Sequence, residues 1–149
     1  MNEIKAPNPI LSFADYQNIF LAGSIEMGVA ENWQDKVKKL LWNRRVQILN
    51  PRRDDWDSSW VQSKDNSQFR QQVEWELEAQ EKADKIIMYF GPKTKSLISL
   101  LELGLFAHSG KMIVICPVGF WRKGNVDIVC ERYGIRQVET LEEAIRDLF

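Results

Sequence analysis

Glu102 is the residue of this 149-residue chain whose type and surroundings most directly suggest chemistry. It lies in the segment Ser96-Leu-Ile-Ser-Leu-Leu-Glu-Leu-Gly-Leu-Phe-Ala107, which predicts a buried helix that is apolar nearly all round. An ionised carboxylate there is costly unless it is hydrogen-bonded, and burial raises its pKa. Sequences retain such groups mostly where they use them, so we interpret Glu102 as functional. The alternative is that one edge of the helix faces solvent and that Glu102 merely marks this edge.

The loop 50–60 is the second candidate, because it contains three Asp, two Arg and two Trp. An indole can stack on a nucleobase, and an Asp can accept hydrogen bonds from ring or amino nitrogens. The alternative is a turn whose indoles pack on the domain. The two interpretations are equally balanced for Trp56, and packing is favoured for Trp60. The other candidates of this loop are Asp54 and Asp55.

Three further positions are weaker candidates when each is taken alone. Glu74 and Glu76 are two residues apart on a predicted helix, so only one of them can belong to a site. Gly23 follows the first strand of the mid-chain series, where a close backbone approach to a sugar is plausible, but its spacing fits no dinucleotide fingerprint or P-loop. Asn125 follows Gly124 and is placed to cap a helix.

Apolar runs of strand length alternate with helix-period segments along most of the chain. This alternation predicts an α/β, flavodoxin-like doubly wound fold, with a five-stranded parallel sheet and helices on both faces. Residues 1–17, with Pro7 and Pro9, are expected to be a flexible N-terminal arm before a single domain over 18–149. The expected strands are 18–23, 46–50, 83–90, 111–116 and 135–138.

Ligands bind beyond the carboxyl ends of the strands in such folds. This rule selects four loops, which together contain most of the candidates: 23–31, 51–67, 91–96 and 117–125. The helix of Glu102 begins directly after the third of them.

Composition excludes several classes of function. A net charge of -1 without a basic stripe argues against a nucleic-acid polymer as partner. No apolar run approaches the ~20 residues that span a membrane, and no signal peptide is evident at the amino terminus. Two cysteines and one histidine provide no metal-binding spacing and no disulfide framework. We therefore expect a cytoplasmic protein without a metal or cofactor.

Six short motifs occur in one order along the chain: Phe20-Leu-Ala-Gly-Ser24, Asn50-Pro-Arg-Arg-Asp-Asp-Trp56, Gln72-Val-Glu-Trp-Glu76, Ala83-Asp84, Glu102-Leu-Gly104 and Gly124-Asn125. As a set they resemble the nucleoside 2-deoxyribosyltransferase family, particularly its shorter, more divergent branch. The resemblance extends over about residues 18–134. It implies exchange of the base on a 2′-deoxynucleoside, with free purine or pyrimidine bases as partners.

The resemblance also implies roles for individual residues. The nucleophile of the family falls on Glu102, and the acidic residue that serves the base is best matched by Glu76. The base-contacting position falls near Asp55, beside Asp54 and Trp56. A late Asn, often supplied by a neighbouring subunit, is matched by Asn125, which implies a homo-oligomer.

Two positions depart from the pattern of the family. Better-known members place an Asp six residues before the nucleophile to hold the deoxyribose hydroxyl, whereas this chain has Ser96. The aromatic residue near Gly23 is Phe20 rather than a Tyr, so a phenolic hydrogen bond to the nucleophile is missing.

The implied mechanism is retaining glycosyl transfer through a covalent glycosyl-enzyme. Glu102 attacks C1′, and Glu76 or Asp55 helps to protonate the departing base. Two alternatives stay open at this point. One is a nucleoside or deoxynucleotide N-glycosidase that passes the sugar to water, and the other is a non-catalytic nucleotide sensor.

Overall fold

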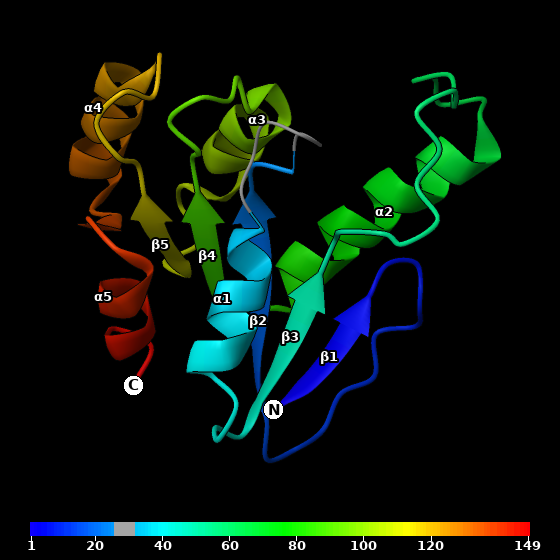
Figure 1. Cartoon of the computed structure of the whole chain (residues 1–149), viewed down its shortest axis with the longest axis horizontal. Coiled ribbons are helices and arrows are strands. Elements are labelled where there is room, and N and C mark those ends of the chain that lie inside the picture. Colours follow the sequence, from blue (N-terminus) through cyan, green and yellow to red (C-terminus); the bar gives the residue numbers. More distant parts are fainter. Residues whose placement is uncertain (26–31) are drawn as a thin grey trace.

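The computed structural model describes residues 1–25 and 32–149. Within these residues six parallel strands form one sheet in the order β1-β3-β2-β4-β5-β6, and five helices accompany it (Figure 1). The strands are β1 (Asn2–Lys5), β2 (Gln17–Gly23), β3 (Val46–Asn50), β4 (Lys85–Tyr89), β5 (Met112–Ile115) and β6 (Arg136–Val138). The helices are α1 (Trp33–Leu40), α2 (Ser67–Lys82), α3 (Leu97–Phe106), α4 (Lys123–Tyr133) and α5 (Leu141–Arg146).

The strand order confirms the predicted doubly wound fold. Without β1, the remaining five strands follow the flavodoxin-like order, which reverses direction between β2 and β4. Ligands of such sheets bind beyond the carboxyl ends of the strands at this reversal. The loops after β2 and β4 are therefore the part of the fold that positions a site.

The sixth strand comes from the segment that the sequence predicted to be a flexible arm. Asn2–Lys5 pairs in parallel with β3, from Asn2 opposite Gln47 to Lys5 opposite Asn50, so the predicted strand number was one too low. The segment contributes Ile4 as its buried apolar residue among polar neighbours, and such a short strand carries no alternation signal. Its place in the sheet depends on hydrogen bonds that β3 offers at the edge.

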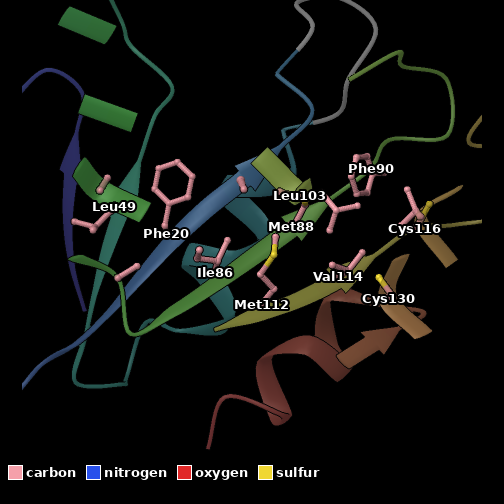
Figure 2. Packing of buried hydrophobic residues seen from close by; sticks show 14 of the residues in the cluster. Phe20, Leu49, Ile86, Met88, Phe90, Leu103, Met112, Val114, Cys116 and Cys130 are labelled. Carbon is pink, nitrogen blue, oxygen red and sulfur yellow. The ribbon is translucent and has the colours of Figure 1, made fainter. Parts of the chain in front are cut away.

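Helices cover both faces of the sheet, as predicted. Side chains alternate along β2, so that Phe20 and Ala22 point to one face and Ile19 and Leu21 to the other. The first face carries α2, α3 and α4, and Figure 2 shows Phe20, Met88 and Leu103 in its hydrophobic cluster. The second face carries α1 and α5. None of the helices in the described ranges is long and apolar enough to cross a membrane.

Helix α4 begins earlier than predicted. Its first residue is Lys123 and its N-cap is Arg122, so Asn125 is the third residue of the helix and not its cap. The turn before it, in which the amide of Lys123 donates to the carbonyl of Phe120, already directs the chain into the helix. The predicted end is confirmed, because Gly134 adopts the left-handed conformation (φ 63°) that ends many helices.

Candidate functional site

Helix α3 has the reverse of the orientation that its sequence suggests. Its long apolar side chains Leu97, Ile98, Leu101 and Leu105 are each more than half exposed, whereas Glu102 is only 8% exposed. The prediction that this helix is buried on all sides was therefore wrong. The alternative, in which Glu102 marks a solvent edge, is wrong as well. Leu103 packs into the core, but Glu102 also points inward while Leu97, Leu101 and Leu105 point outward, an arrangement that hydrophobic burial alone does not produce.

Glu102 of α3 and Glu76 of α2 lie close enough for the charge of one to act on the other. Burial raises the pKa of Glu102 to about 8, and the charge of Glu76 adds to this rise. Burial likewise raises the pKa of Glu76 to about 7. Two carboxyl groups whose pKa values lie near neutrality can take up and release protons at physiological pH.

Each carboxyl group receives a hydrogen bond from a buried glutamine of α2. The amide Nε2 of Gln80 donates to Oε1 of Glu102 at 2.9 Å, and Nε2 of Gln72 donates to Oε1 of Glu76 at 2.8 Å. These bonds partly offset the effect of burial, because they lower the pKa of each group. Gln72, Glu76 and Gln80 recur every four residues, so they share one face of α2.

Strand β2 lies beneath helices α2 and α3, on the face of the sheet that they cover. Helices α2 and α3 both contact β2, whose Phe20 and Ala22 point to their side. Phe20 is fully buried in the hydrophobic cluster that Figure 2 shows. The ring belongs to the core beneath the helices and has no exposed surface that a ligand could contact.

Three buried hydroxyl groups meet at the reversal of the strand order. Ser24 Oγ lies 2.8 Å from Thr94 Oγ1 and 2.5 Å from Ser96 Oγ, and the last two are 2.7 Å apart. The backbone amide of Gly91 donates to Ser24 Oγ at 2.8 Å. Ser96 is the N-cap of α3 in the left-handed conformation, with φ 46°. From there Ser96, Ser99 and Glu102 follow one another at three-residue spacing along α3, and all are buried.

Gly23 ends β2 next to this hydroxyl cluster, and packing accounts for its identity. A Cβ atom at this position would lie 2.2 Å from the carbonyl oxygen of Tyr89 on β4. Its φ of +134° also excludes an ordinary side chain. The glycine thus lets β2 and β4 approach at the reversal of the strand order. Of the loop predicted after it, residues 26–31 lie outside the described residues.

Asp54 and Asp55, in the loop between β3 and α2, are exposed and already paired. Asp54 forms an ion pair with Lys5 of β1 at 2.7 Å. Asp55 receives two hydrogen bonds of 2.9 Å from Arg53, which holds its pKa below the ordinary value. The indoles of Trp56 and Trp60 lie edge to face at 5.1 Å, and the Arg53 guanidinium lies over Trp60. Trp56 is 41% exposed and therefore still offers a face for stacking.

Asn125 lies apart from the carboxyl pair. It is exposed and lines a mainly apolar groove of about 320 Å³ between α3 and α4, together with Leu100, Leu103, Gly104, Trp121, Arg122, Val126 and Val129. Glu102 faces α2 instead, through its bond with Gln80. A single chain therefore places Asn125 and Glu102 on different sides of α3.

The residue pattern predicted Glu102, and the family resemblance selected Glu76 over Glu74. The prediction missed Gln72 and Gln80, which donate hydrogen bonds to these carboxyl groups, and Thr94 of the hydroxyl cluster. The repetition of polar residues every four positions around Glu76 was the available signal for the glutamines. No comparable signal marks Ser24 and Thr94, because they lie 70 residues apart and meet only through the pairing of β2 with β4. Across 1–25 and 32–149, no three His, Cys, Asp or Glu side chains are grouped to hold a metal ion.

The arrangement suits acid–base and nucleophilic chemistry by carboxyl groups. The family model described as nucleoside 2-deoxyribosyltransferase like matches residues 16–120, a range that contains β2 to β5, both carboxylates and the hydroxyl cluster. No match to the chain was found among curated proteins.

Proposed function

Because the chain belongs to the nucleoside 2-deoxyribosyltransferase-like family, we propose that it transfers a 2-deoxyribosyl group between nucleobases. The observation that supports this proposal most directly is the pair of Glu102, buried on α3, and Glu76, half-buried on α2, with both pKa values near neutrality. The reaction needs one carboxylate that attacks carbon and one carboxyl group that supplies a proton.

The proposed first step uses each carboxyl group once. The reactive form of the pair has Glu102 ionised and Glu76 protonated, and it is the minor singly ionised form because the pKa of Glu102 (about 8) lies above that of Glu76 (about 7). From this form Glu102 attacks C1′ of the deoxynucleoside, so that a C1′–O bond forms while the C1′–N bond breaks. The electron pair of the broken bond goes to the base nitrogen, which takes a proton from Glu76. A second base then attacks C1′, Glu102 leaves as a carboxylate, and Glu76 takes back a proton. No cofactor enters this sequence.

Sugar and base recognition are assigned to the loops at the carboxyl ends of the strands. We assign the sugar to the end of the crevice formed by Gly23 and the Ser96 hydroxyl, which stands where better-known members have an Asp. We assign the base to Trp56, with Asp54 and Asp55 as hydrogen-bond acceptors. Because both are paired with cations, they reach a base only by sharing or exchanging Lys5 and Arg53. The indole pair also supplies apolar cover that keeps water from the intermediate.

The decisive test is to incubate the protein with deoxyinosine or thymidine and with adenine, cytosine or no acceptor, followed by chromatography. We expect a new deoxynucleoside that forms only when an acceptor base is present. Release of free deoxyribose at the same rate with and without acceptor would instead identify an N-glycosidase. Thermal stabilisation by nucleosides without any turnover would identify a sensor, and either outcome would contradict the transferase.

We further propose that the chain forms a homo-oligomer through α3 and α4. The exposed apolar side chains of α3 form a stripe on the same helix that lines one side of the groove: Leu97, Ile98, Leu101 and Leu105. This surface therefore offers both a protruding apolar stripe and an apolar groove. A two-fold interface needs such a self-complementary surface. Apolar patches of more than a few hundred Å² mark interaction sites. Asn125 would lie at this interface, and the family resemblance implies that it acts in the site of a neighbouring subunit.

Leu101→Glu is expected to shift the protein from oligomer to monomer, because it places a charge in the middle of the stripe. Light scattering coupled to size-exclusion chromatography measures this directly. Leu11→Glu is the matched control, since Leu11 is equally exposed (58% against 59%) but lies in the N-terminal segment. A wild-type protein that is monomeric at micromolar concentration would overturn the interface.

Subunit mixing tests the assignment of Asn125. Glu102→Gln and Asn125→Ala are each expected to be inactive alone. If Asn125 serves a neighbour, a randomised mixture of two-subunit assemblies regains about a quarter of the wild-type activity, because each hybrid holds one intact site. A mixture that stays inactive would show that Asn125 does not act across the interface.

A further inference from the structure

The two glutamines beside the carboxyl pair have all four of their N–H bonds directed at oxygen atoms. Nε2 of Gln72 donates to the carbonyl of Pro51 and to Glu76 Oε1, both at 2.8 Å. Nε2 of Gln80 donates to the backbone carbonyl of Glu76 at 3.3 Å and to Glu102 Oε1 at 2.9 Å. A rotated amide would turn its carbonyl oxygen toward these acceptors, so each amide is held in one orientation.

This orientation leaves the other end of each amide unsatisfied. Both glutamine Oε1 atoms are buried and have no hydrogen-bond partner in the part of the chain that the structure describes. Gln80 is fully buried and Gln72 is 4% exposed. A buried acceptor without a donor costs free energy, and exceptions of this kind require a reason. Here the reason is that the donors face the carboxylates.

From this geometry, and resting on the function proposed above, we propose that Gln80 is a positioning residue for Glu102. It holds Oε1 of the carboxylate and thereby presents Oε2 as the oxygen that attacks C1′. Among the described residues, Gln80 is the side chain that hydrogen-bonds to this carboxylate, and Glu76 is the titratable group whose charge acts on it. Gln72 holds Glu76 in the same way, through its hydrogen bond to Oε1 of that carboxyl group.

The hydrogen bond from Gln80 to Glu102 has a proposed role at each stage of the transfer. In the free protein it favours the ionised form of Glu102, which attack requires, against burial and the charge of Glu76. In the ester, Oε2 is bonded to C1′ and Oε1 is the carbonyl oxygen, which still accepts from Gln80. When the second base attacks, the C1′–Oε2 bond breaks and its electron pair returns to the carboxylate. The waiting N–H donor stabilises the negative charge that reappears there.

Gln80→Met tests the assignment, because it preserves most of the volume and removes the donor. We expect kcat to fall by roughly 10- to 100-fold with KM changed less than about threefold, as for the loss of a bond to a charged group. We also expect the pKa of Glu102, followed by NMR of 13C-labelled carboxyl groups, to rise by about one pH unit or more. The acid limb of the pH–rate profile should move upward with it.

Gln47→Met is the matched control. Gln47 is also fully buried, and its Nε2 donates to the carbonyl of Leu11 and to Asn18 Oδ1, on β3 and away from the carboxyl pair. It should lower stability without moving either the Glu102 titration or the pH–rate profile. If Gln80→Met does not fold, Gln80→Asn withdraws the amide by one methylene and tests the same titration.

The possible failures are distinguishable from one another. An unchanged Glu102 titration in a folded Gln80 variant overturns the positioning role, whether or not the protein is a transferase. A Gln47 variant that moves the titration equally would also overturn it, because the effect would then be a general result of losing a buried amide. Absence of base exchange by the wild-type protein would reject the proposed function, and the titration would still decide whether Gln80 controls Glu102.

Discussion

Glu102→Gln should lower the rate of base exchange by roughly 10³-fold or more, because an amide cannot attack C1′ and form the ester. The substitution keeps the shape of a buried side chain, and its carbonyl oxygen can still accept the hydrogen bond from Gln80. The fold should therefore survive, which circular dichroism and thermal unfolding will show. The chromatographic exchange assay measures the rate, and turnover close to that of the wild-type protein would exclude Glu102 as the nucleophile.

A 2-fluoro-2-deoxynucleoside should trap the same step. The fluorine destabilises the charge that develops at C1′, so the glycosyl-enzyme accumulates and adds the mass of one fluorinated sugar to the protein. Peptide mass spectrometry should place this mass on Glu102, and the Glu102→Gln variant should remain unlabelled. Glu74→Gln serves as the labelled control, because Glu74 is an exposed carboxylate on the outer side of α2. An adduct on another residue would contradict the assignment.

The stability of the protein should fall as the pH rises from about 5 to 9. Burial raises the pKa of Glu76 to about 7 and that of Glu102 to about 8, from ordinary values of 4.5. Between 4.5 and these values the folded state binds more protons than the unfolded state, so the free energy of unfolding decreases with pH. For Glu102 alone, the cost above pH 8 is on the order of 3–5 kcal/mol.

Glu102→Gln should consequently be more stable than the wild-type protein at pH 9 and should have a flatter dependence on pH. Urea unfolding at pH 5, 7 and 9 measures this difference, and at pH 5 the two proteins should differ little. Glu74→Gln should keep the wild-type dependence. A free energy of unfolding that rises between pH 5 and 9, or a Glu102→Gln variant that is no more stable at pH 9, would show that the carboxyl pair is not held in a dry environment.

The same substitution should thus remove activity and, at alkaline pH, add stability. A carboxylate in a site selected for stability alone would lie at the surface, where water solvates it. Helix α3 instead exposes Leu97, Leu101 and Leu105 and buries Glu102. This inversion links the proposed site to the proposed interface, because the leucines that leave room for Glu102 inside form the stripe that a second copy can cover.

The sequence by itself determined the α/β class and the parallel sheet and singled out Glu102, whereas Glu76 was chosen over Glu74 only through the family resemblance. Apolar strands buried on both faces and helices of regular period are local patterns, and a lone Glu in an apolar helix is visible without any contact information. The edge strand β1 escaped prediction because its four residues carry no pattern, and its place depends on hydrogen bonds from β3. The N-terminus of α4 escaped for a similar reason, since a turn and not a capping side chain directs it.

Only the tertiary structure decided how these parts meet. The positions of α2 and α3 on the sheet decide which face of α3 is buried. They also decide that Glu102 lies near Glu76 and that the two glutamines donate to these carboxyl groups. The hydroxyl cluster needs the register of β2 against β4, which brings Ser24 to Thr94 and Ser96. Helical periodicity states which residues share a face but not which neighbour that face meets, and a pKa depends on that neighbour.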